Sequence, residues 1–137
     1  MRSVVAFSCK PGMSSKMIEA IGTRISGFVA GVLSVSGQEI NRTDIVVREV
    51  DWTNLRTIMS FYSEMIVDHS LDLLQEIDFA VLIRVQASAE QLVGFNNKAG
   101  KIAFFLRGAM QEADPETEMP QGIVHLGFSN ISVAEIS

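Results

Sequence analysis

The feature that most constrains the fold is an order of elements that occurs twice along the chain. An apolar strand-like run, a turn, a helix-spaced stripe and a second strand follow one another in residues 1–52 and again in residues 77–137. SVVAFSCKPGMSSKMIEAIGTRISGFVAGVL, from the first half, aligns without gaps with AVLIRVQASAEQLVGFNNKAGKIAFFLRGAM from the second. Two such units form a four-stranded sheet with two helices on one face, an α+β, ferredoxin-like arrangement. We therefore predict one domain over residues 1–137, with parallel pairing inside each unit because each crossover contains a helix.

The first unit begins with a strand at Ser3–Ser8, followed by a Lys-Pro-Gly turn. Ser14 and Ser15 each offer an N-cap oxygen to the next helix, and TDIVVREVDW is the second strand. Three glycines inside the helix each cost roughly 1 kcal/mol relative to alanine if exposed, which suggests that another backbone approaches closely. The predicted buried stripe of this helix comprises Ile18, Ile21, Ile25, Phe28, Val29 and Val32.

The second unit begins with a strand whose apolar and polar residues alternate. This alternation over Gln75–Ala87 predicts a half-solvated strand, with Arg84 on its polar face. Ser88 and Gln91 have capping-box spacing before the second helix, and GIVHLGFSNISVAEI forms the last strand. The predicted buried residues are Ile77, Phe79, Val81, Ile83 and Val85 of the strand, and Leu92, Phe95, Ala99, Ile102, Leu106 and Ala109 of the helix.

Residues 53–76 connect the two units, and their periodicity fits two structures. Leu55, Ile58, Met59, Tyr62, Met65 and Ile66 have helical spacing, whereas Met59, Phe61, Met65 and Val67 have the spacing of a strand in a hairpin. We favour a helix, because Thr53 is positioned to cap it.

Composition excludes several classes of function. A net charge of -5 with scattered basic residues disfavours nucleic-acid binding, which needs clustered Lys and Arg. The apolar runs are shorter than the roughly 20 residues of a membrane span, and the N-terminal stretch does not resemble a signal peptide. We expect a cytoplasmic protein, or a particle component assembled in the cytosol. Cys9 is the only cysteine, so no intrachain disulfide forms.

The element order, with a strand at the N-terminus and INRTDIVVREVDWTN in the place of the second strand, resembles the tautomerase superfamily. The resemblance covers the chain apart from residues 53–76, and it implies a trimer with ligand pockets between subunits and no cofactor. It also implies a catalytic N-terminal proline, whose amine shuttles a proton in substrates such as 2-oxo acids. This chain has Met1 followed by Arg2 instead, so the only candidate base at that place is a primary amine. We therefore expect weak or absent proline-type activity.

Family members hold the substrate carboxylate with cationic side chains near that amine. In this chain the resemblance points to Lys10 in the first turn and to Arg48 and Arg84 on strands. Ordinary surface or interface charges would occur at the same positions.

Other residue types give no stronger signal. His69 and His125 lack a second ligand at metal spacing, so we expect no metal site. Trp52 and Phe61 fit a core better than a pocket lining. No glycine loop has phosphate-binding spacing, and no serine or cysteine carries a nucleophile motif.

Two further functions remain open beside a tautomerase-like small-molecule protein. One is a structural ring subunit of a phage tail, of the tail-terminator or neck type, and the other is a non-catalytic ferredoxin-like binding module. Four strands leave sheet edges that invite pairing, so we predict a homo-oligomer, with a trimer favoured over a hexamer. Ser132–Ser137 is the segment expected to add to a neighbouring subunit.

Overall fold

The computed structural model describes residues 2–34, 44–54, 77–86 and 96–128. In chain order the elements are β1 (Arg2–Cys9), α1 (Ser15–Leu33), β2 (Ile45–Glu49), β3 (Phe79–Gln86), α4 (Asn96–Ala113) and β4 (Gly122–Phe128). The four strands form one sheet in the order β2-β1-β3-β4. β1 and β2 are parallel, β3 and β4 are parallel, and β1 and β3 are antiparallel. The α+β arrangement of two β-α-β units is thus confirmed.

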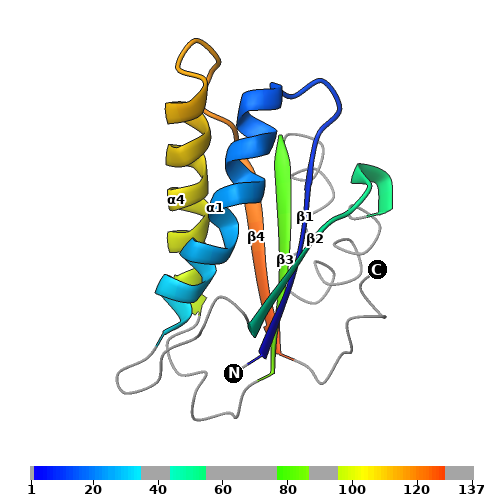
Figure 1. Cartoon of the computed structure of the whole chain (residues 1–137), viewed down its shortest axis with the longest axis vertical. Coiled ribbons are helices and arrows are strands. Elements are labelled where there is room, and N and C mark those ends of the chain that lie inside the picture. The colour runs from blue at the N-terminus through cyan, green and yellow to red at the C-terminus, as the bar shows by residue number, and fades with distance from the viewer. Residues whose placement is uncertain (1, 35–43, 55–76, 87–95, 129–137) are drawn as a thin grey trace.

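Both helices cover the same face of the sheet, as Figure 1 shows. Because side chains alternate along a strand, one set of β1 and β3 residues points at the helices. In this core cluster, the fully buried side chains include Val5, Val81, Ile83, Ile21, Ile25, Ile102 and Leu106. Ile18 and Phe28 were expected in the core and are only partly buried. They lie at the margin of the α1 stripe, whose buried positions include Met17 and Leu33 instead.

The opposite face of the sheet is also buried along β1 and β3. Val4, Ala6, Ala80 and Leu82 form a second cluster there, and Trp52 packs against it. The prediction of a half-solvated β3 is therefore wrong.

One residue assigned to the helix-covered face of β3 lies on the other side. Ile77 belongs to the second cluster, although its spacing from Phe79 places both on one face. The backbone of Asp78 explains the difference, since its carbonyl accepts from the Lys10 N–H and its own N–H donates to the Gln121 carbonyl. The regular alternation of β3 therefore begins only at Phe79.

Two predicted caps are replaced by other contacts. Ser14 is the N-cap residue of α1 but makes no side-chain capping hydrogen bond. Its hydroxyl bonds instead to the carboxylate of Asp114, which joins the start of α1 to the end of α4 and lowers the pKa of Asp114. At the helical turn over 52–54, Asp51 rather than Thr53 accepts the free backbone N–H groups. The Ser88–Gln91 box, the choice between helix and hairpin from residue 55, and the tail after Phe128 lie outside the described residues.

Candidate functional site

The structure places the predicted site residues in three separate environments. Lys10 is exposed in the turn after β1, and its backbone N–H donates to the Asp78 carbonyl at 2.7 Å. Arg48 is exposed on β2, and Arg84 on β3 is 5% exposed. Met1 lies outside the described residues.

Strand register does not bring these cations together within one chain. Arg84 pairs with Val4 across β1 and β3, six residues before Lys10, which corresponds to about 20 Å along an extended strand. Arg48 pairs with Ala6 and is separated from β3 by the whole of β1. Arg84 instead lies near the beginning of β1, because Arg2 pairs with Gln86.

Arg84 shares its face of the sheet with His125. Leu82 pairs with His125, and Arg84 is two residues beyond Leu82 on the same face, opposite the helices. Burial lowers the pKa of His125, and the positive charge of Arg84 lowers it further. His125 is therefore a neutral imidazole at neutral pH, beside a guanidinium that is always charged.

This pair can bind an anion, because a guanidinium donates two parallel hydrogen bonds to a carboxylate and a neutral imidazole donates one more. The sequence analysis set His125 aside because it considered only metal ligation. The alternation of residues along the last strand indicates that His125 faces one side of the sheet. Its neighbours on β3 follow only from the register between β3 and β4.

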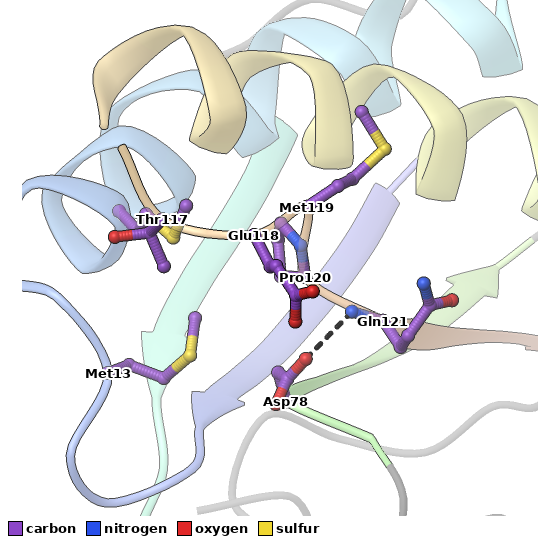
Figure 2. Close-up of a pocket in the computed structure, with 8 residues that line it drawn as sticks. Met13, Asp78, Thr117, Glu118, Met119, Pro120 and Gln121 are labelled. Atoms are coloured by element: carbon purple, nitrogen blue, oxygen red, sulfur yellow. Dashed lines mark hydrogen bonds between the residues drawn. The ribbon is translucent and has the colours of Figure 1, made fainter. Parts of the chain in front are cut away.

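A cavity of about 510 Å³ lies at the other end of the sheet, between the turn before α1 and the segment before β4. Figure 2 shows Asp78 beside it, with a carboxylate oxygen that accepts the Gln121 N–H at 2.9 Å. Gly12 makes the adjoining turn with a φ of 94°, a conformation that glycine adopts without strain. The lining comprises Met13, Met17, Asp78, Thr117, Glu118, Met119, Pro120 and Gln121.

The chemistry of this cavity does not fit a carboxylate ligand. Its described lining contains two carboxylates and three thioethers, and none of these eight side chains is cationic. It suits an apolar or positively charged group. Local sequence patterns do not reveal this cavity, because the contact between the segment before β4 and the start of α1 is tertiary.

The remaining candidates do not add a reactive group. Burial, with a smaller effect of the Glu49 charge, raises the pKa of Cys9 to about 12, so its thiol stays protonated and is a poor nucleophile. In the part of the chain that the structure describes, no three His, Cys, Asp or Glu side chains gather as metal ligands would. None of the described helices has the length and apolar character needed to cross a membrane. Phe61 and His69 lie outside the described residues, and Trp52 packs in the second cluster.

Comparison with known proteins finds a similar solved structure but no match by sequence. No protein-family model matches the chain, and no curated protein matches it. A crystal structure of malonate semialdehyde decarboxylase is similar, with a TM-score of 0.42 and 17% sequence identity, over 95% of this chain and 89% of that one. The activity of this protein is not inferred from a similarity of this size. Its fold is assigned from the strand order and pairing of its own sheet.

Proposed function

We propose that the protein is a self-associating, tautomerase-like small-molecule-binding protein whose ligand is a small carboxylate, such as the enol form of a 2-oxo acid. The observation that supports this most is the burial of Arg84 near the start of β1. A guanidinium can donate two parallel hydrogen bonds to a ligand carboxylate, and at a buried position this contact is only weakly screened by salt.

In this proposal each polar group has a defined role. Arg84 holds the carboxylate, and neutral His125 donates a hydrogen bond to it or to the developing enolate oxygen. The Met1 amine is the only proton acceptor at the place of the family's proline, with an ordinary pKa of about 7.7 to 8.0. Lys10 and Arg48 reach such a site only from a neighbouring subunit. Because a primary amine lacks the fixed ring geometry of a proline nitrogen, tautomerase activity is weak or absent.

Self-association is proposed through the edges of the sheet. β2 and β4 are the outer strands of the four described, and open edges invite pairing with another chain. A trimer is favoured over a hexamer, and the protein is assigned to the cytoplasm. The same edges would serve a phage-tail ring subunit, the second candidate, for which a hexameric ring and a virion location are expected.

Binding of a carboxylate can be tested by titrating phenylpyruvate into the protein, with its methyl ester as an uncharged control. We expect binding of the acid only, loss of binding in Arg84→Gln and partial retention in Arg84→Lys. Arg24→Gln is the matched control, because Arg24 is an exposed cation on α1 whose guanidinium lies 5.3 Å from the centre of the Phe28 ring, in the helical layer. Binding that survives Arg84→Gln in a folded protein contradicts the assignment.

Activity is tested separately by replacing Met1-Arg2 with a processed N-terminal proline. Ketonisation of the enol that appears only in this variant supports a tautomerase-like pocket without its base. Robust activity of the native chain contradicts the expectation of weak chemistry. Failure of both proteins to bind or react favours the ring subunit.

A further inference from the structure

The outer surface of the two helices, facing away from the sheet, carries an apolar groove that the proposed ligand site does not use. The groove has a volume of about 410 Å³, and the rings of Phe28 and Phe105 stack at 5.5 Å between the helices. Phe105 is 44% exposed and the neighbouring Phe104 is 71% exposed. Its lining comprises Gly27, Phe28, Gly31, Val32, Lys101 and Phe105. Exposed aromatic rings that cluster in this way are typical of protein interaction surfaces.

Gly31 lines the groove and Gly108 lies one helical turn after Phe105, and no contact among the described residues requires glycine at either position. A Cβ atom built at Gly31 or Gly108 would meet nothing within 4 Å. Glycine inside a helix lowers its stability relative to alanine, and among the described residues no contact requires glycine at these two positions. A second backbone that approaches the groove closely would require it.

Charges on this surface are separated along α4. Lys101 lies four residues before Phe105, and Glu112 lies seven residues after it. At about 100° per residue, Lys101, Phe105 and Glu112 fall within a sector of roughly 40° on one side of the helix. Lys101 and Glu112 are both exposed. One end of the exposed stripe is therefore basic, its middle is aromatic, and its other end is acidic.

We propose that this surface docks a second copy of the same chain, with the two α4 helices antiparallel and crossing midway between Phe105 and Gly108. A two-fold axis perpendicular to α4 reverses the stripe, so Lys101 of each copy meets Glu112 of the other. The charge pattern favours this occupant because the stripe is complementary to its own reverse. Gly31 and Gly108 then permit close approach of the second copy.

The expected dimer is weak. α1 has 19 residues, which corresponds to a length of about 28 Å, and two helices side by side are about 20 Å wide. The face therefore offers roughly 560 Å² per copy, less than the 800 Å² or so of a typical stable interface. This association goes beyond the proposed function and uses a different surface from the strand edges.

The pairing of Lys101 with Glu112 of a second copy can be tested by reversing each charge singly and then both together. Sedimentation over a range of concentrations measures the association. Lys101→Glu and Glu112→Lys should each weaken helical-face association roughly tenfold, and the double variant should restore it. Glu116→Lys, which reverses an exposed charge in the segment before β4, is the matched control and should leave it unchanged. Restoration is decisive, because a loss of folding would not be repaired by a second charge reversal.

Removal of the exposed ring tests the aromatic centre. Phe104→Ser should keep the circular dichroism of the native chain and abolish the association. If sheet-edge trimers form as proposed, the variants should stop trimers from pairing and leave the trimers intact, so the two associations can fail separately. The proposal is overturned if Phe104→Ser and both charge reversals keep the mass of the native protein. It is also overturned if this surface binds lipid vesicles and the protein does not self-associate through it.

Discussion

The two faces of the sheet are both buried, but by different kinds of residue. On the helix-covered face, large aliphatic residues of β1 and β3 pack against the matching stripes of α1 and α4. On the opposite face, the small residues Ala6 and Ala80 surround Leu82, and Arg84 and His125 occur in the same layer. The first face is a conventional core, whereas the second combines close packing with a buried charge. Because of this difference, we propose the second face for the carboxylate ligand.

The largest expected effect concerns the helix-covered face. Leu106 is fully buried on α4, whereas Phe28 is only partly buried on α1. Leu106→Ala should lower the free energy of unfolding by about 2 to 5 kcal/mol, because it leaves a cavity in a packed core. Phe28→Ala should cost less than Leu106→Ala, although a fully buried phenylalanine would cost about 3 to 5 kcal/mol. Urea unfolding of both variants measures the order, and the reverse order would contradict the assignment of the core.

Leu82→Ala tests whether the face of the sheet opposite the helices is buried to a degree comparable with the helix-covered face. Leu82 is 1% exposed, so truncation should cost about 2 kcal/mol, at the low end of the range for buried leucines because its cluster is smaller than the core under the helices. A residue on a half-solvated face would cost less than about 0.5 kcal/mol. Urea unfolding distinguishes these values, and a change within the lower range would show that the second face is open to water.

The sequence predicted the first face well and the second poorly, for a physical reason. Alternation along β3 identifies Phe79, Val81 and Ile83 as one face, and the helix stripes identify the elements that cover it. A polar residue in the alternating pattern normally indicates solvent, so the burial of Arg84 could not be predicted. The sheet topology followed from the repeated element order, whereas the pairing of His125 beside β3 depends on a register that no local pattern specifies.

Gly122→Ala tests the close packing at the start of β4. A Cβ atom at Gly122 would overlap the ring of Phe79, which is fully buried on the helix-covered face. The variant should lose about 1 to 3 kcal/mol, the usual cost of overpacking. Gly108→Ala is the control, because a Cβ atom there meets nothing within 4 Å. Phe79→Leu should reduce the cost of Gly122→Ala in a double-mutant cycle, and independent, additive costs would contradict this contact.

The smallest effect concerns pH and the second face. Burial and the charge of Arg84 lower the pKa of His125 from its ordinary value of 6.5, so the folded state favours the neutral ring. The unfolded chain then binds more protons below pH 6.5, and the free energy of unfolding falls as the pH falls through the lower folded pKa. The chain has two histidines, so the measurement compares His69→Gln with His69→Gln/His125→Gln in urea at neutral and mildly acidic pH. The single variant should lose more stability on acidification than the double variant, and equal losses would show that His125 titrates alike in the folded and unfolded states. Because the ring is only half-buried, the difference should be smaller than that of any truncation above.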